Sequence, residues 1–257
     1  HLLSELRSRP GLRNARTLLV VPEGAESEAA MALALGATDV LFQPLNYDEL
    51  AHRLRIQMTR KRQADQLRRS VKDGLRMAVT DGLTGLYNRR YALSHLDQIY
   101  ERACDAKRRF AVMVLDLDRF KMVNDRYGHR AGDEVLQEVS QRLQENLRSI
   151  DLVARVGGEE FLVIMPDTTA KQARTAAERL CEIIHEHPIR VSQTVNDLCS
   201  IDIDQTIAIG VASFDGSQAS TDAPHIRVAD LLDRADAALY RAKSAGRNQV
   251  TFSKSAA

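Results

Sequence analysis

The sequence predicts a mixed α/β protein that consists of a short parallel α/β segment and a larger α/β domain. The first observation is that short β-branched apolar runs alternate with amphipathic helical patterns along the chain. The second is an ordinary globular composition, with 44% hydrophobic and 28% charged residues over 257 positions. The third is the length, because domains of about 100–200 residues leave room for one full domain and a companion.

The front of the chain alternates strand and helix. Residues 17–21 and 39–42 form apolar strand patterns, the first of them rich in β-branched residues. Helical patterns cover residues 26–35 and begin again at Asp48. Because short links join these elements, their order predicts a parallel sheet, although two strands make only half of a domain. We therefore expect a partial domain over residues 1–58.

A basic helical pattern follows, and we take residues 59–79 as a linker helix. Basic helices occur in nucleic-acid-binding and membrane-binding proteins. Here a helix that pairs with another helix in a dimer is the better interpretation, because aromatic residues that would stack or insert are absent. The apolar positions of the pattern recur at spacings of three and four, as one helical stripe; they are Leu67, Val71, Leu75 and Ala78.

Residues 80–257 are expected to form one α/β domain. We expect residues 191–195 to be an irregular hairpin partner of the strand at 207–214. The strand patterns cover residues 110–116, 151–155, 159–165, 207–214 and 249–252, and the helical patterns cover residues 89–106, 133–147, 170–187 and 228–244.

The composition excludes several classes of protein. The chain has 36 basic and 35 acidic residues, so its net charge of +1 gives no global reason to bind nucleic acid. Its three cysteines are scattered, which argues against a disulfide framework and a zinc site. Its apolar runs are far shorter than the ~20 residues of a membrane span, and no secretory leader pattern opens it. We therefore expect a cytoplasmic protein that does not insert into membranes.

The most informative segment is an apolar strand that ends in acids. Residues 112–118 read VMVLDLD, and because side chains alternate along a strand, Asp116 and Asp118 project to the same face at its end. Mg²⁺ in proteins is bound by one or two carboxylates, by water and by substrate phosphates. For this segment alone, a metal site and a pair of solvent-facing acids are equally good interpretations.

A second segment, residues 157–161 (GGEEF), lies between two strand patterns. Gly-Gly predicts a tight hairpin, because such turns need positive φ. Glu159 and Glu160 follow at once and point to opposite faces of the strand. Acids beside the buried run 161–165 would cost stability without a partner. That partner is a metal ion or, alternatively, a neighbouring arginine such as Arg155.

Together these segments resemble the GGDEF family of diguanylate cyclases. The resemblance covers about residues 78–252, in order and at family-like spacing, and the front of the chain is similar to the receiver-like adaptor of PleD-type response regulators. The motifs that carry it are DGLTGLYNRR at 81–90, LDLDRFK at 115–121, NDRYGH at 124–129, Gly132-Asp133 and GGEEF at 157–161.

The resemblance implies a cyclase or palm-like fold over residues 80–257, in which helices flank a mostly antiparallel central sheet. A partial flavodoxin-like receiver domain and the linker helix precede it. In the receiver-like part, Pro22 and Gln43 stand where receivers carry Ser or Thr and Lys, and no phosphoacceptor Asp can be identified. We therefore expect a dimerising adaptor, with any phosphorylation on an upstream receiver or by a sensor kinase.

The resemblance also implies a Mg²⁺ or Mn²⁺ site with two ions per active site. Asp116, the Leu117 carbonyl and Glu159 would hold the first ion, and Glu160 would join the second. Glu159 is the expected acceptor of the hydroxyl proton, with activation by the metal alone as the alternative. Lys121 would stabilise charge on the phosphates. We accordingly expect Glu159, Lys121 and Glu160 to be the catalytic residues.

The substrate implied is GTP. Asn and Asp side chains can pair with the donor and acceptor edge of guanine, which suits Asn124 and Asp133. Lys243 and Arg247 would reach the phosphates; alternatively, they bind free carbonyls at a helix C-terminus. The full set that the resemblance assigns to GTP is Phe120, Asn124, His129, Asp133, Lys243 and Arg247.

The implied reaction condenses two GTP into cyclic di-GMP with loss of two pyrophosphates. Each domain would hold one GTP, so two copies of the chain would meet as a homodimer. Arg148 and Asp151 resemble the family's RxxD inhibitory site for the product, and Arg102 would belong to a second product-contacting surface. The structural alternative for Arg148 and Asp151 is an ordinary helix-end ion pair, worth ~0–1 kcal/mol if exposed.

Other functions compete with this one. A non-catalytic cyclic di-GMP receptor would keep the RxxD site, but Asp116, Glu159 and Lys121 argue against it. A cyclase acting on a single ATP is the nearest enzymatic alternative, and Asn124 and Asp133 favour guanine. A nucleic-acid-binding protein would show a steep salt dependence of its affinity. The departure to GGEEF keeps a carboxylate at the third position and therefore keeps the expected activity.

Overall fold

The computed structural model describes residues 14–192, 200–216 and 224–253, together with residues 5, 6, 8, 9, 11 and 12. Two compact units make up the chain, residues 1–76 and residues 77–257. In the described part of the chain, no helix has the length and apolar character that a transmembrane span requires.

The first unit contains the parallel strand pair that the sequence predicts. Residues Leu18 to Val21 pair with Asp39 to Phe42 in parallel register. The core beside the pair is small, and its buried members are Val21, Ala29 and Val40. The elements of this unit are β1 (Leu18–Val21), α2 (Glu26–Ala34), β2 (Asp39–Phe42) and most of α3 (Tyr47–Val79).

Helix α3 is continuous from Tyr47 to Val79. Its first turn is capped by Asn46, whose Oδ1 accepts hydrogen bonds from the backbone N–H groups of Asp48 and Glu49. The Arg53 guanidinium lies 2.7 Å from Asp39 Oδ1 at the start of β2. The first unit is thus held by this ion pair as well as by its small core.

The second unit is built on a six-stranded sheet of order β10-β9-β4-β6-β5-β3. The central strand β4 pairs antiparallel with both β6 and β9, whereas the edge strands β3 and β10 pair parallel with their neighbours. The mostly antiparallel sheet expected from the sequence is therefore confirmed. Its strands are β3 (Tyr87–Asn88), β4 (Arg109–Leu117), β5 (Leu152–Arg155), β6 (Glu160–Pro166), β9 (Ile207–Asp215) and β10 (Val250–Phe252).

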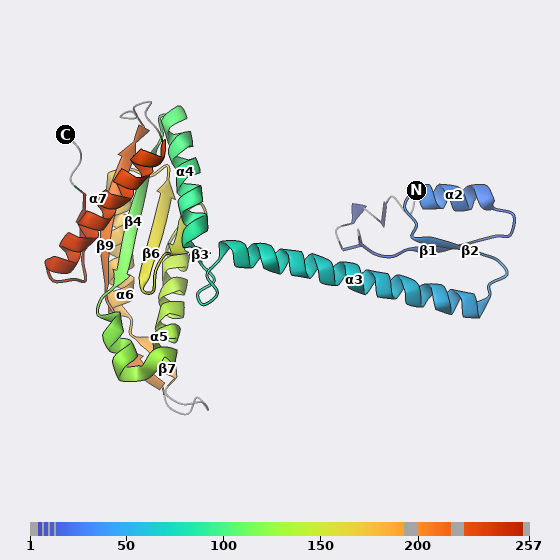
Figure 1. Ribbon diagram of the computed structural model, residues 1–257, viewed down its shortest axis with the longest axis horizontal. Helices are drawn as coiled ribbons and strands as arrows, with labels where there is room; N and C mark the ends of the chain where they lie inside the picture. The colour runs from blue at the N-terminus through green and yellow to red at the C-terminus, as the bar shows by residue number, and fades with distance from the viewer. Residues whose placement is uncertain are drawn as a thin grey trace. The chain divides into compact units, whose positions relative to one another are not determined.

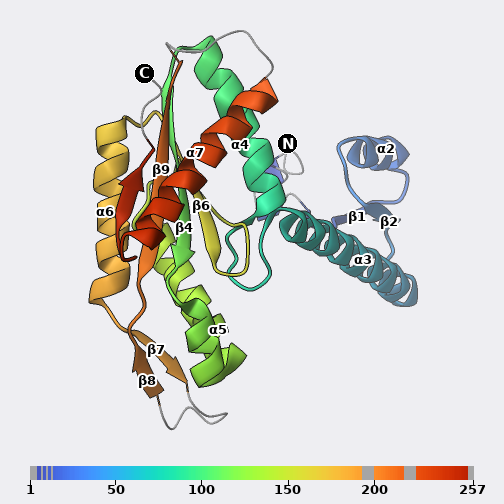
Figure 2. The ribbon, with the colours of Figure 1, turned by 60° about the vertical axis from the view of Figure 1, so that its left-hand side comes forward.

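Helices cover both faces of this sheet, and Figure 2 shows α6 and α7 on opposite sides of β9. Met113 and Leu115 of β4 belong to the core under α5 and α6, whereas Val112 and Val114 belong to the core under α4 and α7. Because β4 is buried on both faces, it reads as a continuous apolar run. The helices, all visible in Figure 1, are α4 (Arg89–Asp105), α5 (Phe120–Glu145), α6 (Ala170–Glu186) and α7 (Pro224–Ser244).

Two elements differ from the prediction. Helix α5 begins at Phe120 instead of near residue 133, and a kink at Gly128 (φ 83°, ψ 162°) divides it into two segments. The predicted partner of strand 207–214 is wrong, because β7 (Ile189–Ser192) pairs with β8 (Ser200–Ile203) in a separate small sheet. β9 already has β4 and β10 as its two neighbours. Positions 193–195 of the expected segment lie outside the described residues.

Candidate active site

The acidic end of β4 is the centre of the candidate site. Asp116 is buried, with 5% of its surface exposed, because it is the second-last residue of a strand that is covered on both faces. Lys243, near the end of α7, places its Nζ 2.7 Å from Asp116 Oδ2. A strand and a helix that are far apart in sequence thus bring one buried carboxylate and one cation together.

The GGEEF hairpin brings two more acids to this point. Glu160 is the register partner of Asp116 across the β4–β6 pair. The backbone N–H of Leu117 donates to the carbonyl oxygen of Glu159 at 3.2 Å. Directly paired residues project on the same face of a sheet, so the side chains of Glu160 and Asp116 are neighbours. The expected metal residues Asp116, Leu117, Glu159 and Glu160 therefore lie side by side.

The prediction that the two glycines of this hairpin have positive φ is wrong. The hairpin is present, but neither Gly157 nor Gly158 has a φ in the left-handed region. Instead, a Cβ on Gly157 would lie 2.4 Å from Glu160 Oε2. The hairpin is wider than a two-residue turn, since the N–H of Val156 donates to the Glu160 carbonyl at 2.9 Å. Gly157 leaves room for the Glu160 carboxylate.

Burial and like charges raise the pKa of Asp116 and of Glu159. Desolvation raises the pKa of Asp116, and the charges of Glu160 and Asp118 add to this, while Lys243 opposes it. Desolvation also raises the pKa of Glu159, and the charge of Asp116 acts in the same direction. A cluster of this kind favours a bound cation, because positive charge relieves both effects.

The acids fit a divalent cation. The expected first set consists of two carboxylates and one backbone carbonyl, and Mg²⁺ commonly takes its remaining ligands from water and phosphate oxygens. Within the ranges that the structure describes, no three His, Cys, Asp or Glu side chains come close enough to form a metal site by themselves. The Lys243 ammonium beside Asp116 marks the place where positive charge is accommodated.

Asp118 forms hydrogen bonds to two other segments of the domain. Its Oδ2 accepts a hydrogen bond from Thr206 Oγ1 at 2.7 Å and another from the backbone N–H of Asn248 at 2.9 Å. It thereby connects the end of β4 to the segment that leads into β10. The same segment carries Arg247, so Asp118 helps to place that residue.

The residues expected to bind guanine are arranged by the kink of α5. A Cβ on Gly132 would lie 1.9 Å from Asn124 Oδ1, so the Asn124 side chain lies directly against Gly132, next to Asp133. Asp133 and His129 are exposed. Phe120 has only 4% of its surface exposed and belongs to the hydrophobic core. The structure therefore brings the Asn124 side chain to the segment that carries Asp133 and gives Phe120 a packing position.

The expected phosphate-binding cations lie around the same end of the sheet. Lys121 is exposed in the first turn of α5, directly after the strand-end acids. Lys243 pairs with Asp116 rather than with carbonyls at the helix end. Arg247 follows the end of α7, where Gly246 (φ 120°) and Arg247 itself (φ 66°) reverse the chain and the Arg247 N–H donates to Ala242 O.

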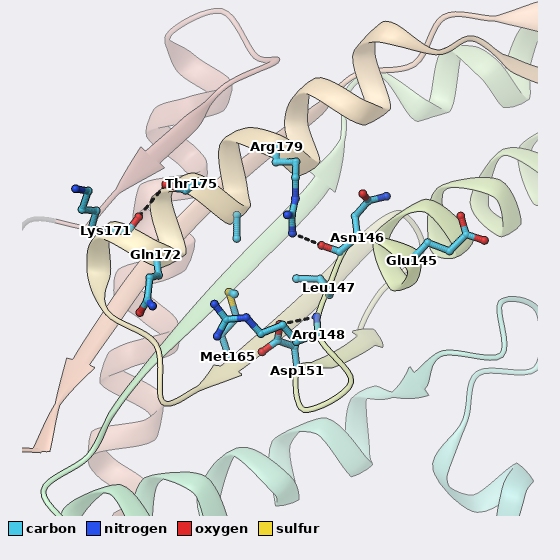
Figure 3. Close-up of a pocket in the computed structure, with 11 residues that line it drawn as sticks. Glu145, Asn146, Leu147, Arg148, Asp151, Met165, Lys171, Gln172, Thr175 and Arg179 are labelled. Carbon is cyan, nitrogen blue, oxygen red and sulfur yellow. Dashed lines mark hydrogen bonds between the residues drawn. The ribbon is translucent and has the colours of Figure 1, made fainter.

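Arg148 and Asp151 line a separate pocket of about 490 Å³ between α6 and the loop before β5 (Figure 3). The backbone N–H of Arg148 donates to Asp151 Oδ2 at 3.0 Å, while the Arg148 guanidinium forms no ion pair with any described residue. The expected alternative, a helix-end ion pair, is therefore not formed. Burial raises the pKa of Asp151, against the positive charges of Arg148 and Arg179.

Arg102 lies elsewhere. It lines a pocket of about 290 Å³ together with His95 of α4 and Ile150. Because Ile150 stands between Arg148 and Asp151 in sequence, the loop that carries these two residues also forms a wall of the Arg102 pocket.

Sequence reasoning did not assign roles to several residues of these sites. Arg179 of α6 lines the Arg148 pocket and donates to the carbonyl of Asn146 (Figure 3). Arg179 is 31 positions from Arg148 in the sequence. The one sequence signal for its place is the spacing of four from Thr175, which puts both residues on the same face of α6, toward the pocket. Arg155, the alternative partner that the sequence offers for the glutamates, forms its ion pair with Asp81 instead.

Comparisons with known proteins agree with this geometry. Residues 78–249 match the family model described as "Diguanylate cyclase, GGDEF domain". The response regulator PleD of Caulobacter vibrioides is 40% identical over 245 residues, which cover 95% of this chain and 51% of PleD. The chain thus spans about half the length of this curated relative.

Solved structures of similar proteins match most of the chain. The coiled coil and GGDEF domain of DgcB from Caulobacter crescentus, in complex with c-di-GMP, has a TM-score of 0.65 at 29% identity, over 79% of this chain and 98% of that one. The active GGEEF domain of a diguanylate cyclase from Vibrio cholerae has a TM-score of 0.56 at 28% identity, over 66% and 98%. With the strand-end acids, the GGEEF hairpin and the sheet in place, the chain belongs to the GGDEF family of diguanylate cyclases.

Proposed function

We propose that this chain condenses two GTP into cyclic di-GMP with release of two pyrophosphates. The observation that carries the proposal is the cluster at the end of β4, where the buried carboxylate of Asp116 and the hairpin acids meet Lys243, directly before α5. Carboxylates and cations suit phosphates, and the Asn124 and Asp133 side chains of α5 suit a purine edge. The Vibrio cholerae relative, described as active, carries a GGEEF domain too.

In this proposal the residues of the site have separate roles in the reaction. Glu159 accepts the proton of a 3′-hydroxyl as that oxygen attacks the α-phosphate of the other nucleotide; the bond from this phosphate to pyrophosphate breaks. Lys121 and Arg247 stabilise the charge on the phosphates. Mg²⁺ or Mn²⁺, two ions per site, would polarise the phosphate oxygens. The residues that would hold these ions are Asp116, Leu117 through its carbonyl, Glu159 and Glu160.

The enzyme acts as a homodimer in this proposal, since each copy offers one guanine-binding set and the reaction joins two nucleotides. The apolar stripe of α3 supports it: Leu67 and Val71 are 66% and 54% exposed. Large apolar side chains on one stripe of a helix are suited to pairing with the same stripe of a second copy.

Product inhibition is the second part of the proposal. Among the described residues, Arg148 contacts Asp151 through its backbone N–H and its guanidinium forms no ion pair, and one buried oxygen of Asp151 has no hydrogen-bond partner there. Arg179 points toward the same pocket (Figure 3). Two guanidinium groups and a carboxylate around one pocket suit a ligand that carries both phosphates and guanine edges. Arg102 would supply a second contact.

We further propose that residues 1–58 form a receiver-like adaptor and that residues 59–79 link it to the cyclase domain at 80–257. The parallel β1–β2 pair and the connecting helix α2 support this. In this scheme the protein works in the cytoplasm, and phosphorylation of an upstream receiver, or a sensor kinase, supplies the signal.

The test compares the protein with its Asp116→Ala variant. We expect the natural sequence to convert GTP to cyclic di-GMP, and the variant to lose this activity while it still binds cyclic di-GMP in calorimetry. Asp202→Ala, at an exposed ion pair with Arg190, is the matched control and should keep full activity. A natural protein that binds cyclic di-GMP but consumes no GTP would instead be a receptor.

A further inference from the structure

Arg155, the last residue of β5, joins two loops that are far apart in sequence. Its Nε and one terminal nitrogen donate to the carbonyl oxygen of Gly158, at 3.1 and 2.7 Å. Its other terminal nitrogen donates to Asp81 Oδ1 at 3.2 Å. The Arg155 side chain is only 15% exposed and that of Asp81 26%, so this ion pair is partly shielded from water.

Asp81 is itself fixed in a closed turn. Its Oδ1 accepts hydrogen bonds from the backbone N–H and the hydroxyl of Thr84, at 2.9 and 2.7 Å. Its backbone N–H donates to Leu86 O, and Gly85 N–H donates back to Asp81 O. Although burial acts in the opposite direction, the Thr84 and Arg155 hydrogen bonds lower the pKa of Asp81, so this carboxylate stays ionised. Gly85 has a φ of +72°, which suits a glycine at the end of this turn.

The Gly158 carbonyl is part of the peptide group that enters Glu159. On the other side of Glu159, its carbonyl accepts the N–H of Leu117 at 3.2 Å. The backbone of Glu159 is therefore held at both ends, by Arg155 before it and by β4 after it. The planar guanidinium of Arg155 donates to Gly158 and to Asp81 at the same time. The single ammonium group of a lysine cannot reproduce this geometry.

We propose that Arg155 is a positioning residue, which uses Asp81 as an anchor to hold the Gly158 carbonyl and thereby sets where the Glu159 carboxylate stands. This inference rests on the proposed cyclase function. It assigns the ion pair a role in the reaction in addition to its contribution to stability. The turn that carries Asp81 follows α3 directly in the chain, so the position of the hairpin also depends on how that turn is held.

The first measurement needs no nucleotide. Hydrogen–deuterium exchange of the hairpin amides should be faster in Arg155→Met than in the natural protein, since the hydrogen bond from Val156 N–H to Glu160 O loses its support. Peptides from α6 should exchange at the natural rate. Arg190→Met, which removes another Arg–Asp pair of 3.2 Å in the same unit, is the control and should leave the hairpin unchanged.

The second measurement separates kcat from KM. Arg155→Met should lower kcat by about 10- to 100-fold, as expected for a misplaced catalytic group, while KM for GTP stays within about 2-fold. Arg155→Lys should be intermediate, and so should Asp81→Asn, which keeps the contacts to Gly158. The double variant Asp81→Asn/Arg155→Met should be no worse than Arg155→Met alone, because the two residues act as a unit.

The outcomes are distinct. The positioning role would be overturned if Arg155→Met had the same kcat and the same exchange rate of the hairpin amides as the unsubstituted protein. It would also be overturned if the effects of the two substitutions on kcat were additive. If Arg155→Met fails to fold, Arg155→Lys and Asp81→Asn give the same comparison. A natural protein without any cyclic di-GMP synthesis would contradict the proposed function, whereas the exchange experiment would still report on Arg155.

Discussion

At the scale of single residues, the pair formed by Asp116 and Lys243 shows how the site balances its charge. Burial raises the pKa of Asp116, the charges of Glu160 and Asp118 add to this, and Lys243 stabilises the charged form. Removing one partner of such a pair leaves a buried charge without compensation. The site is therefore sensitive to the loss of Lys243 before any substrate is present.

We expect Lys243→Met to lower the free energy of unfolding by about 1–3 kcal/mol, the usual cost of a buried group left without its partner. The double variant Asp116→Asn/Lys243→Met should recover most of this loss. Urea denaturation would measure both, with Lys171→Met, an exposed lysine of α6, as the control. A double variant no more stable than the single one would mean that the lysine acts through packing alone.

Glu159 provides a prediction for pH. Burial, helped by the charge of Asp116, raises its pKa above the ordinary 4.5, so the charged form costs stability in the folded protein at neutral pH. Glu159→Gln should therefore raise Tm by about 1–3 °C at pH 7. The gain should shrink as pH falls through the raised pKa toward 4.5, where the natural side chain becomes neutral in the folded state.

Calorimetric scans of Glu159→Gln and the natural protein between pH 4.5 and 8, in buffer with a chelator, would measure this gain. Added Mg²⁺ should narrow the gap at pH 7, because it stabilises only a protein that keeps the carboxylate. A Tm gain that is constant with pH would show that the charge of Glu159 costs nothing.

From the residues themselves, the position of an individual side chain could be predicted only where the neighbouring sequence determines it. Asp116 and the GGEEF acids each follow or precede an apolar run, so their place at a strand end was evident. The pairing of Asp81 with Arg155 was not, because 74 positions separate them and only the fold brings them together. The role of Gly157 was also missed, since it depends on where the Glu160 carboxylate lies.

At the scale of elements, the two segments of α5 explain how the residues that we propose to bind guanine come together. The kink at Gly128 lets the second segment start beside Asn124, and Gly132 has no side chain that would keep them apart. A β-carbon at Gly132 would also come within 3.2 Å of the Phe120 ring. The absence of a side chain at Gly132 thus leaves room for both the Phe120 ring and the Asn124 amide.

Gly132→Ala should raise KM for GTP by about 10-fold, because the new methyl group displaces the Asn124 amide that we propose pairs with the base. A lost or misplaced polar contact of about 1.4 kcal/mol has this effect. Steady-state kinetics would measure it. Gly74→Ala, at a helical glycine of α3 with open space around it, is the control and should leave KM unchanged. An unchanged KM in Gly132→Ala would remove Asn124 from the base-binding set.

Most elements could be predicted because their periodicity is strong, and α5 was not fully predicted because its first segment carries polar residues that we propose to bind the substrate. Polar side chains interrupt the helical pattern between residues 120 and 128, and the expected start fell at Asp133 instead. Strand pairing is a tertiary property, which is why β7 was assigned to the wrong neighbour. The parallel pair β1–β2 was predicted, since a short helix connects its strands.

At the scale of the whole molecule, the proposal requires two copies. Each second unit has one cluster of acids at the end of β4 and one set of residues on α5 that we propose to bind a base, while the proposed product joins two nucleotides. The exposed stripe of α3 provides a surface for the pairing of copies. The rate of product formation should therefore depend on how much of the protein is paired.

The measurement that tests this most directly is incubation of the purified protein with GTP and Mg²⁺ at several protein concentrations, with the nucleotides resolved by chromatography. We predict cyclic di-GMP and two pyrophosphates for each product molecule, at a rate that rises faster than linearly with protein concentration while the dimer is only partly formed. Absence of cyclic di-GMP at every concentration, or a strictly linear rate under conditions in which the protein is monomeric, would contradict the proposal that two copies of this site make the product.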